Sequence, residues 1–151
     1  MRIIEDNLES AAVAALLQKH LLGMARHSPP DSIHALDIEA LRADDITFWT
    51  AWEGQELLGC GALKQLDARH GEIKSMRTAS SYLRRGVAAG ILSHLIAESR
   101  ARGYRRLSLE TGSGAAFAPA ALLFAKFGFD YCGPFGHYGP NPFSRFMTLT
   151  L

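Results

Sequence analysis

The sequence predicts a single mixed α/β domain, and three observations support this fold class. The chain has 151 residues, which is the usual length of one domain. Hydrophobic residues make up 48% and charged residues 21%, proportions that allow a packed core. Strand-like segments dominate the first half, whereas helical and strand-like segments alternate in the second. We therefore expect residues 1–151 to form one domain around a central sheet.

The N-terminal half begins with a short strand over Arg2–Glu5, followed by a helix. Asn7 and Ser10 are both residue types that cap helices, and apolar residues recur at helical spacing over residues 13–24. The prolines at 29–30 end this helix, because proline lacks a backbone N–H and disfavours helix in the residue before it.

Three further strands follow a possible short helix at residues 37–42. β-Branched and aromatic residues indicate these strands, which cover Ile46–Glu53, 57–66 and 72–78. Short turns separate them, and together with the strand at Arg2–Glu5 this run of four strands predicts an antiparallel meander. Gly59 and Gly61 alternate in the middle strand, which suggests that another backbone approaches it closely.

Helices and strands alternate in the C-terminal half. A long helix is predicted over residues 85–102, with Gly103 at its C-terminal end, and a shorter one over residues 118–127, with Pro119 in its first turn. Three strands accompany them, at residues 105–111, 129–135 and 144–151. The long helix gives room for a crossover, so we expect the strands on either side of it to be parallel.

Charge and composition exclude several classes of partner. The formal net charge is only +1, so a nucleic-acid partner is not expected. No stretch approaches the roughly 18 consecutive apolar residues of a spanning helix, so we expect no membrane partner. The first residues turn acidic where a signal peptide would be apolar, which favours a cytoplasmic protein. Cys60 and Cys132 lie in apolar runs without metal-type spacing, so both are expected to be reduced core residues.

The junction that opens the long helix is a candidate anion site. Backbone N–H groups and the positive end of the helix dipole point outward there. Gly86 and Ala88 are small enough for a phosphate to approach the backbone, and Arg84 and Arg85 add positive charge. The alternative is an ordinary solvated helix start with two surface arginines.

The wider pattern resembles the GNAT superfamily of acetyltransferases. The order is a strand at 72–78, a loop and helix opening with Arg-Arg-Gly-Val-Ala at 84–88, a second strand, and a late helix that runs from Phe117 to Gly128-Phe129. Each short motif is weak, but their order and spacing over residues 72–129 are fairly specific. The remaining predicted elements fit the same topology.

This resemblance implies a fold and a co-substrate. The fold is a mostly antiparallel sheet of about seven strands, splayed between strands 4 and 5 and flanked by about four helices. The co-substrate is acetyl-CoA, with its pantetheine arm in the split and its pyrophosphate on the loop before the long helix. By this resemblance the cofactor-binding residues are Met76, Arg77, Thr78, Arg84, Arg85, Gly86, Val87, Ala88, Ala89, Phe117 and Phe124.

The sequence departs from the family pattern at three positions. Leu83 stands where the family usually has glutamine or arginine, and Phe117 stands where asparagine often opens the late helix. Phe124 occupies the place of a tyrosine that commonly protonates the leaving thiolate. A phenylalanine cannot donate a proton, so water or Tyr138 could substitute, and a thiolate leaves tolerably well unaided.

Acetyl transfer to an amine needs a base and a polarised thioester carbonyl. Glu72 lies fourteen residues before Gly86 (86 − 72), a spacing that resembles the histone acetyltransferase branch, where a strand glutamate is the general base. Glu110, on the neighbouring strand, is the rival base or a substrate anchor. The resemblance also implies that the Met76 backbone N–H polarises the carbonyl. The alternatives are a solvated strand-end glutamate and a regular, fully paired strand.

Two loops are candidates for the acceptor side, at residues 26–34 and 135–142. The proposed substrate contacts are His27, Ser28, Glu110 and Tyr138. Both loops carry histidines, but no His-x-x-His pair or carboxylate cluster accompanies them, so no metal is expected.

Taken together, these features predict an acetyl-CoA-dependent N-acetyltransferase that acts on a primary amine of a small molecule by direct attack in a ternary complex. One alternative is a protein or peptide acetyltransferase for lysine side chains or N-termini. Another is a CoA-binding module without catalysis. The resemblance also makes a homodimer possible.

Overall fold

The structure is a computed structural model that describes residues 1–27 and 37–151, except for the side chains of Met24 and His27. Within these residues one sheet contains seven strands: β1 (Arg2–Glu5), β2 (Ile46–Glu53), β3 (Glu56–Asp67), β4 (His70–Thr78), β5 (Arg106–Gly112), β6 (Asp130–Cys132) and β7 (Ser144–Thr150). The described part also contains four α-helices: α1 (Ala11–His27), α2 (Ile38–Leu41), α3 (Val87–Ala101) and α4 (Ala118–Lys126). Short 3₁₀ turns, Ser80–Tyr82 and Ala115–Phe117, precede α3 and α4.

The strand order in the sheet is β1-β2-β3-β4-β5-β7-β6. The first four strands form the predicted antiparallel meander. The pair β4–β5, joined by the α3 crossover, is parallel as expected, and β7 pairs antiparallel with both β5 and β6.

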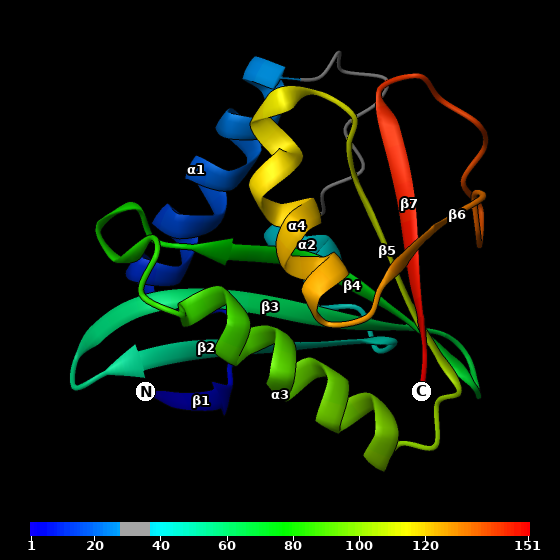
Figure 1. Cartoon of the computed structure of the whole chain (residues 1–151). Helices are drawn as coiled ribbons and strands as arrows, with labels where there is room; N and C mark the ends of the chain where they lie inside the picture. Colours follow the sequence, from blue (N-terminus) through cyan, green and yellow to red (C-terminus); the bar gives the residue numbers. More distant parts are fainter. Residues whose placement is uncertain (28–36) are drawn as a thin grey trace.

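The central strands β4 and β5 pair over only the first part of their length. β4 and β5 pair from His70–Arg106 to Ile73–Leu109, and neither pairs with the other beyond that point although both continue. Figure 1 shows β4 and β5 diverging as a V from the edge near the C-terminus. The predicted splay between the fourth and fifth strands is therefore present.

A bulge in β4 lies where the strands have separated. Cys60 of β3 pairs with Arg77, but Ala62 pairs with Lys74, so two residues of β4 lie opposite the single residue between them. One of the two, Ser75, has a left-handed φ of 52°. This irregularity ends the regular pleat of β4 inside the opening of the V.

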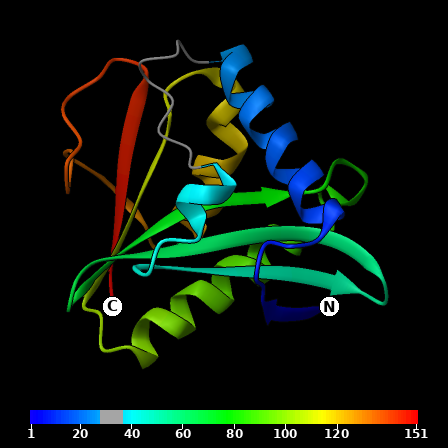
Figure 2. The ribbon, with the colours of Figure 1, turned by 180° about the vertical axis from the view of Figure 1, so that it is seen from behind.

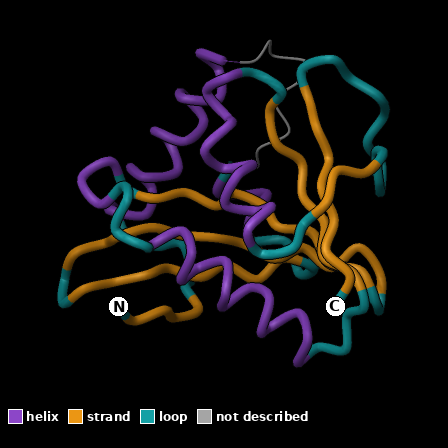
Figure 3. Tube along the Cα trace, viewed as in Figure 1, coloured by secondary structure: helices purple, strands orange, loops and turns teal. Residues whose placement is uncertain are grey.

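Helices cover both faces of the sheet. α3 and α4 lie on one face (Figure 1), and α1 and α2 lie on the other, as the view from behind shows (Figure 2). In the tube view, α4 occupies the opening of the V between the diverging strands (Figure 3). The main core lies beneath α3 and α4, and a smaller one lies beneath α1 and α2.

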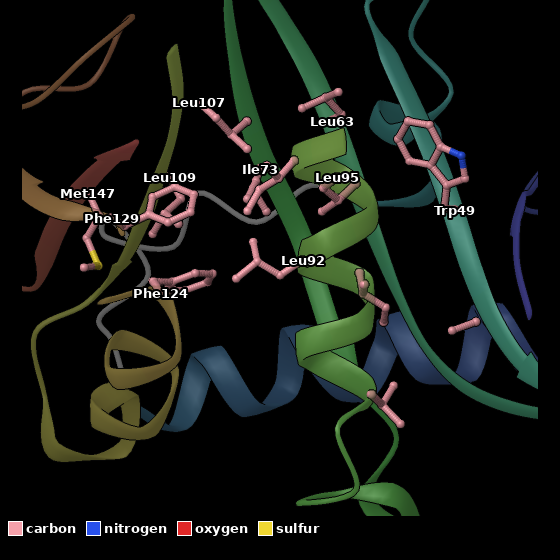
Figure 4. Packing of buried hydrophobic residues seen from close by; sticks show 14 of the residues in the cluster. Trp49, Leu63, Ile73, Leu92, Leu95, Leu107, Leu109, Phe124, Phe129 and Met147 are labelled. Atoms are coloured by element: carbon pink, nitrogen blue, oxygen red, sulfur yellow. The ribbon is translucent and has the colours of Figure 1, made fainter. Parts of the chain in front are cut away.

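The spacing of buried residues in α3 explains why this segment forms a helix. Its buried residues recur at three- and four-residue spacing: Val87, Ile91, Leu92, Leu95 and Ile96. Leu92 and Leu95 meet Ile73 of β4 in the core (Figure 4). Glycines with φ of +81° stand at both ends, Gly86 and Gly103. The helix therefore starts at Val87, two residues later than predicted, because Gly86 has left-handed backbone geometry.

The two glycines of β3 have different neighbours. A Cβ at Gly59 would come within 2.5 Å of the Arg77 carbonyl oxygen, so the predicted close backbone approach is found there. A Cβ at Gly61 would instead meet the side chains of Ile91 and Leu95. The second glycine thus makes room for α3 rather than for a backbone.

Two predictions near the C-terminal edge were wrong. β6 is limited to Asp130–Cys132 instead of 129–135, because Pro134 lacks the N–H that a longer ladder needs. Cys132 is half-buried on this edge strand and is not a core residue. Cys60 is fully buried, and burial raises the pKa of its thiol to about 12; both cysteines are free thiols.

No helix among the described residues is long and apolar enough to cross a bilayer.

Candidate active site

A cleft of about 440 Å³ lies where β4 and β5 separate. Its walls come from α1, β4, β5, α4 with the segment leading into it, and the loop between β6 and β7. The predicted site residues that line it are Glu72, Met76, Arg77, Glu110, Phe117, Phe124 and Tyr138. Residues from four separate stretches of sequence therefore meet in one cavity.

A buried polar triad forms part of the wall of this cleft. Glu72 is 2% exposed and Lys74, two residues along the same strand, is 9% exposed. The Tyr138 hydroxyl donates a hydrogen bond of 2.6 Å to Glu72 Oε2, and Lys74 Nζ donates one of 2.7 Å to the Tyr138 oxygen. Lys74 Nζ also lies 3.4 Å from Glu72 Oε2. The ammonium and the phenol together compensate the buried carboxylate.

Aromatic packing holds Tyr138 over the sheet. Its ring contacts Phe135 edge-on and Phe146 in a tilted geometry, with ring centroids 5.2 and 5.4 Å apart. Burial and the Glu72 charge raise the pKa of the Tyr138 phenol above its ordinary value. Tyr138 therefore stays protonated at neutral pH and can serve as a proton donor.

Glu110, the rival carboxylate, lines the same cleft from β5. It lies directly after Leu109, the last β5 residue that pairs with β4, whereas Glu72 lies directly before Ile73, the matching residue of β4. Its Oε2 accepts a hydrogen bond of 2.8 Å from Ser144 Oγ. Both carboxylates thus flank the point where the strands separate, and geometry leaves both as candidate proton acceptors.

The β4 bulge affects the predicted carbonyl-polarising segment. Ser75 and Met76 lie together opposite Gly61, so β4 is distorted there and is not a regular, fully paired strand. Arg77 also lines the cleft. Thr78 pairs with Gly59 at the end of the β3–β4 ladder and does not line the cleft.

The loop before α3 has the backbone geometry of a helix-start anion site. Arg84 has a φ of +63° and Gly86 one of +81°. Gly86 is the N-cap, and no side chain caps the first turn. A Cβ at Gly86 would meet no atom within 4 Å, so the approach to this backbone is open. The open, uncapped backbone N–H groups at the start of α3 suit a phosphate.

The side chains of this loop are not in the cleft. Arg85 stacks over the Tyr82 ring at 5.6 Å and lines a second hollow of about 390 Å³ together with Gly86 and Val87. The Val87 side chain is buried in the core, so only its backbone is available to a ligand. Ala88 and Ala89 follow in the first turn of α3, partly exposed.

Two phenylalanines form the apolar wall near α4. Phe117 precedes the helix and packs against Gly112, where a Cβ would collide with its ring. Phe124 is 6% exposed and meets Phe129 edge-on, with centroids 5.7 Å apart (Figure 4). Neither ring carries a polar atom, so this wall provides no acid.

Some predicted contacts lie outside the described residues, and some cleft residues were not predicted. Ser28 and the side chain of His27 cannot be placed. The cleft residues that were not singled out include Lys74, His20 and Gly23, whereas Arg26 was covered only as the first residue of the candidate acceptor loop at 26–34. Two signals could have found them: Lys74 shares a strand face with Glu72, and the three α1 residues recur at three-residue spacing on one helix face. Among described residues, no group of three or more His, Cys, Asp or Glu side chains could hold a metal.

Comparison with known proteins agrees with this arrangement. The model of the acetyltransferase (GNAT) family matches residues 13–129. The uncharacterised N-acetyltransferase YsnE of Bacillus subtilis (strain 168) is 59% identical over the whole of both chains. The uncharacterised N-acetyltransferase YedL of Escherichia coli (strain K12) is 53% identical over 97% of this chain and 92% of its own.

Solved structures show the same fold. A GNAT family acetyltransferase from Elizabethkingia anophelis, with acetyl-CoA bound, superposes with a TM-score of 0.69 at 19% identity, over 99% of this chain and 97% of that one. The family and the fold predicted from motif order are therefore confirmed, as is an enzyme rather than a non-catalytic module. The chain belongs to the acetyltransferase (GNAT) family and is an acetyl-CoA-dependent N-acetyltransferase.

Proposed function

We propose that this enzyme transfers the acetyl group of acetyl-CoA to a primary amine of a small molecule, by direct attack in a ternary complex. The observation that carries the proposal is the cleft at the β4–β5 parting, where Glu72, Glu110 and Tyr138 meet beside an apolar wall. One side of the cleft suits an uncharged thioester arm and the other suits an amine that must lose a proton.

Acetyl-CoA would enter this opening along its α4 side. The thioester supplies an activated acyl group, and Phe117 and Phe124 offer apolar contact to the arm that carries it. Backbone N–H groups of Arg84–Ala89 would hold the pyrophosphate, because Gly86 leaves the start of α3 open and uncapped. The bulge takes Ser75 and Met76 out of the regular β3–β4 pairing. This favours the Met76 N–H as the donor to the thioester carbonyl.

Glu72 is the proposed general base. A primary amine with a pKa near 10 is largely protonated at neutral pH and must lose a proton before or during attack. The Tyr138 hydroxyl already donates a hydrogen bond of 2.6 Å to Glu72. Tyr138 could therefore pass its proton to Glu72 while taking one from the amine, with Lys74 stabilising the oxygen in between. Glu110 is the alternative base and would act directly.

The size of the cleft favours a small acceptor over a protein. About 440 Å³ lies within the range of small-molecule pockets and has to hold both the acyl end of the co-substrate and the acceptor. A peptide acetyltransferase needs a groove that admits a chain on both sides of the lysine. We therefore expect any acetylation of peptides to have a lower kcat/KM than acetylation of the preferred small amine.

The test is a thiol-release assay with acetyl-CoA against a panel of small amines and lysine-containing peptides. We expect small amines to be acetylated with the higher kcat/KM, and initial-rate lines at varied co-substrate to intersect. Parallel lines with an isolable acetyl-enzyme would contradict direct attack. Higher kcat/KM for peptides than for every small amine would contradict the substrate class.

A further inference from the structure

The α1 side of the cleft is rich in nitrogen-bearing side chains. His20 and Arg26 come from α1, and Arg77 comes from β4 beyond the bulge. The carboxylates Glu72 and Glu110 line the same cleft, and Lys74 lies beside Glu72. The cleft therefore presents both cationic and anionic side chains to a bound molecule.

Arg77 is the central group among these nitrogen-bearing side chains. Because of the bulge, Arg77 pairs with Cys60 and lies on the same face as Lys74, toward α1. Its Nη1 is the atom nearest to where a Cβ of Gly23 would lie, at 3.9 Å, so the guanidinium rests against α1 where that helix has no side chain. Its Nε is buried and has no hydrogen-bond partner within residues 1–27 and 37–151.

A guanidinium with a buried and unpartnered Nε is unfavourable by itself. Such a half-buried cation loses solvation, and within residues 1–27 and 37–151 no carboxylate forms an ion pair with Arg77. A carboxylate can accept two parallel N–H hydrogen bonds from the planar guanidinium group. This pairing compensates the positive charge of the arginine and gives its N–H donors an acceptor. The residue type thus matches a carboxylate better than a neutral group.

His20 supports the same reading independently. Its Nδ1 is likewise buried without a partner in the described part of the chain. Burial, and then the charge of Arg77, lower the pKa of His20 to about 4, so the ring is neutral at physiological pH and leaves Arg77 as the charged group. A neutral imidazole can donate a hydrogen bond to an oxygen that already faces Arg77.

We propose that the acetyl acceptor is an amino carboxylate, whose carboxylate binds Arg77 and His20 while its amine faces Glu72 and Glu110. This inference rests on the proposed function and narrows its substrate class. Binding of the acid end on the α1 side and the ammonium end near the carboxylates would fix the direction of the acceptor in the cleft. The Arg77 backbone remains available to the pantetheine arm, because only the side chain turns toward α1.

The first experiment compares matched acceptors with the wild-type enzyme. Each set contains an amino acid, its carboxamide and the amine that lacks the carboxyl carbon, for example phenylalanine, phenylalaninamide and phenethylamine, extended over several side chains. The kcat/KM for thiol release should be higher for the acid than for the amide by on the order of 10- to 100-fold in the preferred set, the value of a charge-assisted hydrogen bond. Amides or simple amines that are equal or better throughout would overturn the inference.

The second experiment changes Arg77. Arg77→Met should lower kcat/KM for the acid much more than for the amide, so that the acid-to-amide ratio falls toward one, whereas Arg77→Lys should keep part of the preference because it retains a point charge. Arg100→Gln, at an exposed position in the last turn of α3, is the matched control and should keep the full preference. Calorimetric binding of acetyl-CoA and thermal unfolding confirm that each variant is intact.

The outcomes separate this inference from the proposed function. Equal losses for acid and amide in Arg77→Met would place Arg77 outside acceptor recognition and overturn the inference alone. Acetyl-CoA binding without turnover on any small amine would overturn the proposed function, and the inference with it. If Arg77→Met does not fold, the wild-type panel and Arg77→Lys still decide the question.

Discussion

The Tyr138 hydroxyl donates a 2.6 Å hydrogen bond to Glu72 Oε2, although 66 residues separate them in the chain. The contact joins the loop between β6 and β7 to β4 at the point where the sheet opens. Lys74 completes the link by donating to the same phenol oxygen. The proposed proton acceptor is therefore buried, compensated and connected to the cleft through a second titratable group, as general bases in enzymes are.

Glu72→Gln should remove the proposed base while keeping its shape. The rate constant for acetyl transfer should fall by a factor on the order of 10²–10⁴, the usual contribution of a positioned base. Single-turnover measurements are needed, because product release can conceal a slower chemical step. The acidic limb of the pH–rate profile should vanish or move, with acetyl-CoA affinity unchanged. Glu110→Gln is the matched comparison, and a larger loss there would make Glu110 the base.

Tyr138→Phe should test the proton relay separately from the packing of the ring. The ring contacts with Phe135 and Phe146 survive the change, but the bridge between Lys74 and Glu72 is lost. If the phenol passes the proton, the single-turnover rate should fall roughly 10- to 100-fold, somewhat less than for loss of the base itself. An unchanged rate with a stable fold would rule out the phenol as the relay, so that either Glu72 receives the proton through water or Glu110 takes it directly.

Gly86→Glu should abolish binding of acetyl-CoA, because a carboxylate at the start of α3 blocks and repels the pyrophosphate. Calorimetry measures this directly. Gly103→Glu provides a matched control at the other end of the same helix. Both glycines have a φ of +81° and no atom within 4 Å of a built Cβ, so both variants carry similar backbone strain. Normal binding by Gly86→Glu would place the pyrophosphate elsewhere.

His20 should make the protein less stable in mild acid. The pKa of His20 is lowered from 6.5 to about 4 in the folded protein. Between these values the unfolded chain takes a proton that the folded chain does not, so the free energy of unfolding decreases as the pH falls. The shift corresponds to about 3 kcal/mol, lost from just above pH 6.5 down to about pH 4.

Denaturant unfolding at several pH values, from 7 to 4, measures this loss. His20→Gln removes the titrating group and should flatten the slope over that window, although its stability at pH 7 can also change. His137→Gln, at an exposed position, should keep the wild-type slope. A slope that is the same in all three proteins would show that His20 is not buried as a neutral ring.

The sequence by itself determined the fold and the family. Hydrophobic periodicity placed each strand and helix of the sheet to within a few residues, because alternation and 3.6-residue spacing are local properties. The order of the motifs from residues 72 to 129 then identified the acetyltransferase pattern, including the departure at Phe124. That residue is a buried wall of the cleft with no acid to offer.

Local signals failed where the backbone departs from regular geometry. The length of β6 depends on Pro134, and Cys132 is half-exposed because its strand lies at the sheet edge, a position that composition does not show. The start of α3 moved to Val87 because Gly86 has a positive φ. Each of these three differences depends on the backbone conformation of a single residue or on its position in the sheet.

Only the tertiary structure decided which side chains share the site. Glu72, Lys74 and Tyr138 meet because the loop between β6 and β7 folds back over β4, and aromatic contacts far apart in sequence fix that loop. Arg77 faces α1 because the bulge at Ser75 and Met76 resets which face of β4 each later residue occupies. Contacts of this kind depend on distances in space between segments distant in sequence, and periodicity within a segment carries no information about them.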